Sequence, residues 1–208
     1  MIARSTVGPQ PSFGSSGYRL PEIAGARQRH ADALRLAREQ SHRAGEADAR
    51  IGLAMVARRT GDLVGAEEHM RAVLAWFREA GYGPGTTLAL AELGFTAELR
   101  GDPDRARALH REGLAATRAL GDVRAVALAL EGLAGAAAAG GERERAARLL
   151  GAAHAARTSV GAPLPPAERY DVDRTWSACL SALSRTAAEA AFALGATHPP
   201  EAEPAACC

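Results

Sequence analysis

Lysine and asparagine are absent from this chain, and aromatic residues are scarce. All 25 basic residues among the 208 are Arg. Hydrophobic residues make up 47% of the chain but aromatic residues only 4%, and Ala dominates the hydrophobic set. Such a composition does not supply a core of aromatic clusters. It favours a core of closely packed helices with small side chains.

The chain also lacks an excess of positive or negative charge, and it lacks a long hydrophobic run. The 25 Arg are interleaved with 24 acidic residues, so no basic stripe remains for phosphates and we expect no nucleic-acid binding. No apolar run approaches the length of a membrane span. Residues 1–20 lack the apolar region of a signal peptide, and three Cys are too few for a disulfide framework. These absences predict a cytoplasmic protein without a membrane segment.

Catalytic motifs are absent too. The sequence has no G-x-S-x-G, no H-E-x-x-H, no C-x-x-C and no Gly-rich phosphate loop followed by Lys. We therefore predict a protein that is not an enzyme, with no catalytic residue, no metal site and no cofactor.

A helical hairpin is the main feature that is present. Between Thr87 and Leu114, apolar or small residues recur three to four positions apart, as on one face of a helix. Gly101, Asp102 and Pro103 interrupt the pattern. Gly can end one helix, Asp can cap the next, and Pro suits the first helical position. The segment therefore predicts two helices joined by a tight turn.

The hairpin pattern returns at a period of 40 residues. One position of the second helix is occupied by Ala four times, at Ala26, Ala66, Ala106 and Ala146. A fixed period is typical of a solenoid, in which each hairpin buries its apolar face against its neighbours. We expect the last three of these Ala residues to be buried where the two helices of a hairpin cross.

Two histidines share a position of this repeat with apolar residues. His30 and His110 stand where Met70 and Leu150 stand in the other repeats. A position that accepts Met and Leu is a packing position at the helix–helix seam. We therefore interpret both His residues as structural rather than as metal ligands.

The repeat resembles the tetratricopeptide repeat. Leu90, Leu93, Gly94 and the later Ala106 stand at the offsets of that pattern, with its aromatic residues replaced. The closing Pro is missing, and the period exceeds the usual value of about 34, so HEAT and armadillo repeats are alternatives by length. The Leu-Gly pair, the Gly-Asp turn and the following Ala favour the tetratricopeptide type. We predict an all-α fold, a tetratricopeptide-like right-handed solenoid of helical hairpins.

About nine helices are expected along the chain. They are 21–43, 46–59, 63–80, 85–100, 103–120, 122–139, 142–158, 167–182 and 185–194. The last two leave the 40-residue register, which is typical of a capping unit. The predicted organisation is a disordered lead over 1–20, repeats over 21–158, capping helices over 159–195 and a flexible tail over 196–208.

The C-terminal part resembles a family of regulators. The segments Ala146–Arg157, Gly161–Arg169 and Ala188–Phe192 are similar to the end of the large LuxR-type and AfsR-type ATPase regulators of actinobacteria. That resemblance implies a tetratricopeptide sensor or partner-binding region coupled to an ATPase and a DNA-binding domain. This chain has no Lys, hence no Walker lysine, and no recognisable DNA-reading helix–turn–helix.

The tetratricopeptide resemblance also implies where a partner would bind, because the first helices of such hairpins line a concave groove. Counting from the Leu-Gly pair places six candidate residues there: Asp48, Met55, Arg58, Phe95, Glu98 and Glu131. The apolar members would anchor a peptide and the charged members would orient it. Tetratricopeptide proteins that grip a chaperone C-terminus use Lys and Asn, which this chain lacks, so that ligand is disfavoured.

The sequence thus predicts a non-enzymatic protein–protein interaction module that takes a protein or peptide partner, within a regulatory complex. A small-molecule sensor and a degenerate fragment of a larger regulator are the alternatives. The oligomeric state stays open. Cys179 is expected in the core, whereas Cys207 and Cys208 are expected to be accessible.

Overall fold

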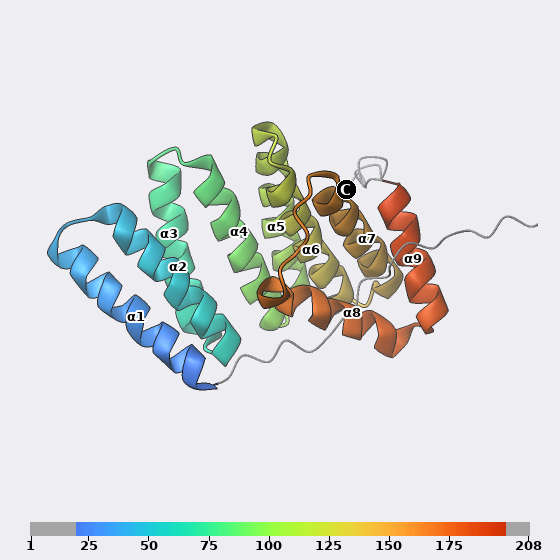
Figure 1. Ribbon diagram of the computed structural model, residues 1–208, viewed down its shortest axis with the longest axis horizontal. Coiled ribbons are helices and arrows are strands. Elements are labelled where there is room, and N and C mark those ends of the chain that lie inside the picture. The colour runs from blue at the N-terminus through green and yellow to red at the C-terminus, as the bar shows by residue number, and fades with distance from the viewer. Residues whose placement is uncertain (1–19, 199–208) are drawn as a thin grey trace, which may run out of the picture.

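The structure, a computed structural model, describes residues 20–198, and over that range it is entirely helical apart from turns and the segment before α8. The helices are α1 (Leu20–Glu39), α2 (Arg43–Thr60), α3 (Leu63–Glu79), α4 (Gly83–Leu99), α5 (Pro103–Leu120), α6 (Val123–Ala139), α7 (Arg143–Ser159), the 3-10 turn η1 (Pro166–Glu168), α8 (Tyr170–Ala182) and α9 (Arg185–Thr197). Consecutive helices pack as hairpins in a curved stack (Figure 1). The predicted all-α hairpin solenoid is confirmed.

Turns that recur every 20 residues explain the 40-residue period. The backbone has positive φ at Gly61, Gly81, Gly101, Gly121, Gly141 and Gly161. The residue after each of these Gly donates its N–H to a carbonyl five positions earlier, as Asp102 does to Ala97 at 3.0 Å. This bond closes the end of a helix. The turns within and between hairpins have the same length. Two helices of 17–18 residues with their two turns therefore make a repeat that is longer than the usual length of about 34 residues.

The predicted end of the first helix is wrong. The expected helix over 21–43 stops at Glu39, and α2 begins at Arg43. The intervening turn falls in the same 20-residue series, but Ser41 takes the left-handed position with φ 53°. The sequence has no Gly there, so the pattern that revealed the later turns was missing.

Small residues let the helices of a hairpin approach closely. Ala66, Ala106 and Ala146 are at most 1% exposed, which confirms the predicted crossing points. Asp62 and Asp102 accept hydrogen bonds from the backbone N–H groups of Gly65 and Arg105, and so they cap α3 and α5. Local turn chemistry and tertiary packing therefore agree along the stack.

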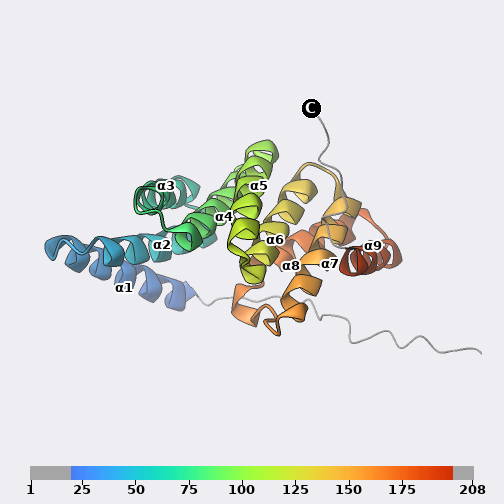
Figure 2. The ribbon, with the colours of Figure 1, turned by 90° about the horizontal axis from the view of Figure 1, so that it is seen from above.

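The last two helices are arranged differently from the repeats. Figures 1 and 2 show α9 beside α7 at the end of the stack, whereas α8 runs crosswise to the repeat helices. Helices α7 and α9 touch at Gly151 and Gly195, where an added Cβ would lie 1.9 Å and 1.8 Å from carbonyl oxygens of the other helix. Backbone contact of this kind holds α9 firmly to α7, and through α9 it fixes one end of α8.

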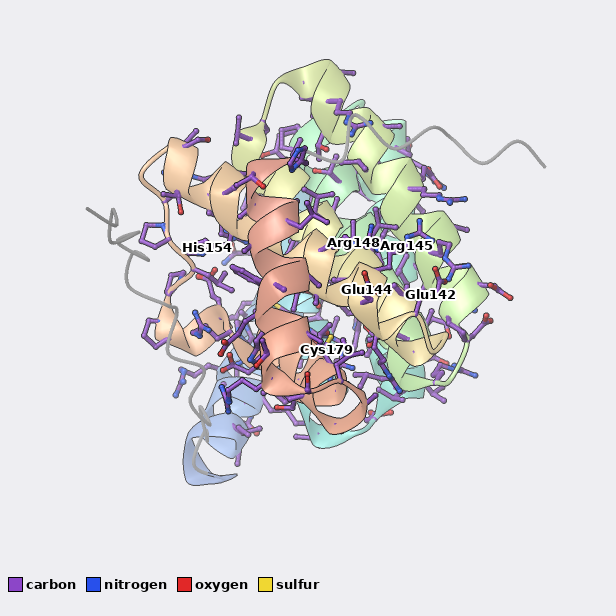
Figure 3. The ribbon with its side chains drawn as sticks, turned by 90° about the vertical axis from the view of Figure 1, so that its right-hand side faces the viewer. Glu142, Glu144, Arg145, Arg148, His154 and Cys179 are labelled. Atoms are coloured by element: carbon purple, nitrogen blue, oxygen red, sulfur yellow. The ribbon has the colours of Figure 1, made fainter. Side chains whose placement is uncertain are left out.

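Cys179 belongs to the core of this C-terminal end (Figure 3). It is 0% exposed, its Sγ lies 3.4 Å from the Arg143 carbonyl oxygen, and burial raises the pKa of its thiol to about 11. The predicted core position is confirmed, while Cys207 and Cys208 lie outside the described residues. Within residues 20–198, no helix combines the length and hydropathy needed to cross a membrane.

Candidate partner-binding trough

Three first helices, α2, α4 and α6, present one face toward α8, and we call this face the trough. Of the six residues expected there, Asp48 is exposed and Met55 is half-buried. The other four are between 2% and 6% exposed: Arg58, Phe95, Glu98 and Glu131. The structure therefore divides the predicted set into an open group at the α2 end and a covered group further along.

Arg58 is the centre of the covered group. Its Nε donates to Glu92 Oε2 at 3.1 Å, and its Nη1 donates to both carboxylate oxygens of Asp171 at 2.8 Å and 3.0 Å. Its guanidinium carbon lies 5.2 Å from the centre of the Phe95 ring, within cation–π range. One Arg side chain thus joins α2, α4 and α8.

Glu98 extends this network along α4. Arg174 Nη1 of α8 donates to Glu98 Oε1 at 2.6 Å, and its Nη2 lies 3.3 Å from Asp171 Oδ1. Asp171 and Arg174 lie one helical turn apart on α8. Asp171 pairs with Arg58 of α2, and Arg174 pairs with Glu98 of α4. The helix α8 is therefore held in the trough by complementary ion pairs in which Arg58 and Glu98 are buried and Arg174 remains 31% exposed.

Glu131 is engaged from a different direction. Arg157, near the end of α7, donates to both of its carboxylate oxygens at 2.6 Å and 3.0 Å. This bidentate pair is 11% and 6% exposed on its two side chains. The pair ties α6 to α7 beside the segment that leads to α8.

Burial sets the electrostatics of these groups. It raises the pKa of the Glu92 carboxyl, and attraction to Arg58 only partly offsets that shift. It likewise raises the pKa of Glu131 against the opposing hydrogen bond from Arg157. Burial alone would lower the pKa of Arg58, but Glu92 and Asp171 together raise it above its usual value. Arg58 is therefore a permanently charged group that neutralises Glu92 and shares the neutralisation of Asp171 with Arg174.

His110 lies directly beneath this network. It is 1% exposed, and its ring meets the Phe95 ring edge-on with 4.9 Å between centres. An added Cβ on Gly94 or Gly132 would come within 2.4 Å and 2.0 Å of the ring, so those positions must stay small. Burial lowers the pKa of His110 to about 3, and the imidazole is neutral at physiological pH. The packing interpretation fits, since Met70 and Leu150 at the same repeat position are also buried.

A cavity of about 310 Å³ opens beside the trough between α4, α5 and α6. Its buried walls include Thr87, His110 and Thr117, and its outer walls include Arg157 and Glu168. Neither ring nitrogen of His110 has a hydrogen-bond partner within the described chain. The cavity could therefore hold water or a small polar molecule.

The charged segment that opens α7 pairs within its own helix start, and Glu142 also accepts from Arg107 of α5. Glu142 accepts from Arg145 at 2.8 Å, and Glu144 accepts from Arg148 at 2.8 Å, along one side of the helix (Figure 3). These pairs are partly solvated and lie outside the trough. Within residues 20–198, no group of three or more His, Cys, Asp and Glu is arranged to hold a metal ion.

The sequence analysis missed the residues that complete the trough. Asp171 and Arg174 come from a helix outside the repeat register, and counting from the Leu-Gly pair could not reach them. A signal was present, because four charged residues, two Asp flanked by two Arg, fall within Arg169–Arg174 at the start of that helix. Such a charged helix start requires partners when it lies against a buried surface.

Comparison with known proteins gives one result for part of the chain. No curated protein matches the sequence. Residues 45–119, which span α2 to α5 almost completely, match the family model described as Tetratricopeptide repeat.

Proposed function

We propose that this chain is a non-enzymatic protein–protein interaction module that binds a protein or peptide partner along the trough. The observation that carries the proposal is α8 itself. The trough already receives a helix crosswise, recognised by Asp171 and Arg174 through ion pairs to Arg58 and Glu98. A surface that binds one helix in this way has the shape and charge to bind part of another protein.

The open end of the trough is where a partner makes its first contact. Asp48 and Met55 share a helix face with Arg58 on α2, at spacings of seven and three positions, but Asp48 is exposed and Met55 is only half-buried. Asp48 would orient a basic group of the partner, and Met55 would contact an apolar one.

The double variant Asp48→Arg with Met55→Glu tests this proposal. We expect it to lose a partner that the wild-type chain retains from native lysate, since both changes oppose the expected contacts. Asp104→Arg is the matched control, because Asp104 is a highly exposed acid on the second helix of a hairpin. A partner retained equally by all three proteins would place binding elsewhere on the molecule.

A small-molecule sensor is the second candidate, and the cavity beside His110 favours it. A ligand there would contact α4, α5 and α6 together and so alter how two neighbouring repeats pack. Such a ligand would raise the melting temperature with concentration, as expected for binding to the folded state. A compound screen that finds no stabilising ligand, alongside capture of a protein partner, would decide for the interaction module.

The setting of the module is part of the same proposal. Its resemblance to the C-terminal region of actinobacterial regulators supports a place in a cytoplasmic regulatory complex. Within that scheme residues 21–158, from α1 to α7, supply the repeats, and the segment from 159 to 195 closes the stack. Co-purification with an ATPase or a DNA-binding protein would support this setting, and capture of proteins of other classes alone would contradict it.

A further inference from the structure

A second cavity lies on another part of the molecule and shares no residue with the trough. It has a volume of about 450 Å³ and opens between α5, α6, α7 and α9. Its walls are mostly apolar, and they include Val123, Val126, Leu130, Ala152, Ala155 and Ala156. Its size lies within the range of small-molecule sites.

Arg118 is the cation of this cavity, and it has no ion-pair partner within residues 20–198. The preceding repeat shows what is missing. There Arg78, the residue equivalent to Arg118, donates to Glu112 at 2.5 Å. A shift of 40 residues replaces that Glu by Ala152, which is 6% exposed and forms part of the cavity wall. The same substitution therefore removes the partner of Arg118 and leaves apolar space beside it.

One large apolar side chain of the cavity wall also reaches the surface. Val123 lines the cavity and is 36% exposed. An apolar side chain at the edge of an apolar cavity adds contact area for a ligand.

We propose that this cavity binds a small amphiphilic monocarboxylate, with its hydrocarbon part among the apolar walls and its carboxylate on Arg118. A guanidinium offers parallel N–H donors that match the two oxygens of a carboxylate. The single cation favours a monoanion, and the apolar walls favour an alkyl chain over a sugar or nucleotide. The site lies apart from the trough, so the test of ligand binding here is independent of the test of partner binding there.

Titration of the full chain with decanoate, and with decanol as the uncharged probe, tests this proposal. We expect decanoate to bind and to raise the melting temperature further as its concentration rises above its Kd. Arg118→Gln should weaken decanoate roughly tenfold and leave decanol unchanged, as expected for loss of one charge-assisted interaction. Arg78→Gln is the matched control, since it removes the equivalent Arg one repeat earlier and should change neither affinity.

A second variant tests the apolar part. Ala156→Leu adds volume within the cavity and should weaken both probes, whereas Arg118→Gln affects only the anion. Failure of decanoate to bind, or a fall in melting temperature on its addition, would overturn the site. Equal weakening of decanoate by Arg118→Gln and Arg78→Gln would overturn the carboxylate assignment, and binding that survives Ala156→Leu unchanged would place the probe outside the cavity.

Discussion

The two ends of the trough place the same helix face in different environments. At the α2 end, Asp48 is exposed and Met55 half-buried. One turn beyond, Arg58 is 4% exposed and bound to Glu92 and Asp171. The repeat places all three residues on one face, but the off-register helix α8 pairs with Arg58 and helps to bury it.

From this difference we expect residues of the open end to affect binding and residues of the covered end to affect stability. Charged residues under α8 are shielded from water and are stabilised by one another's charge, so changing one of them should lower the stability of the fold. Charged residues at the open end keep their hydration, so changing one of them should affect binding alone. The predictions below test this division, beginning with the largest effect.

Arg58→Met should be the most damaging of these changes. It keeps much of the apolar contact with Phe95 but leaves Glu92 and Asp171 without their shared cation. Removal of one partner from a buried ion pair costs about 3–5 kcal/mol. Denaturant unfolding of the variant beside wild type measures this cost.

An exposed pair provides the control for Arg58. Arg35 and Glu39 form an i,i+4 ion pair with both side chains more than half exposed. Arg35→Met should change the free energy of unfolding by less than about 0.5 kcal/mol. If both variants cost the same, the network under α8 does not differ from a surface ion pair, and the division between the two ends fails.

His110 predicts a smaller effect that depends on pH. Its pKa falls from 6.5 to about 3 in the folded chain because of burial, so on acidification the unfolded chain takes up the proton first. Stability is therefore lost as pH falls below the unfolded value. Between about pH 7.5 and about pH 5 the loss should be about 2 kcal/mol.

His110→Met isolates that contribution, because Met70 fills the same position in the previous repeat. Thermal or denaturant unfolding at the two pH values should show a smaller acid loss for the variant by about 2 kcal/mol. The carboxyls that also titrate in this range are common to both proteins. Identical pH profiles would mean that His110 is not held neutral beneath the trough.

The sequence was sufficient to predict the repeated helices and their turns. It was insufficient to predict how the C-terminal helices outside the repeat are placed. Turn residues such as Gly101 and Asp102 act locally, so helix ends near them were predictable, and the turn at Ser41 was missed because it lacks Gly. The placement of Arg58, Phe95 and Glu98 on one face followed from periodicity. Their burial did not, because it depends on α8, whose path is fixed by the contact of α9 with α7 at Gly151 and Gly195.

Asp48 gives the smallest expected effect and the sharpest test of the open end. Its side chain has no hydrogen-bond or ion-pair partner among residues 20–198, and it is exposed on α2. Asp48→Asn should therefore change the free energy of unfolding by no more than about 0.5 kcal/mol. The same unfolding measurement on Arg58→Met, ten positions later on the same helix, should show the largest loss in the free energy of unfolding. A loss above about 1 kcal/mol for Asp48→Asn would show that the α2 end contributes to folding as the covered end does. The open surface would then have to be sought on another face of the stack.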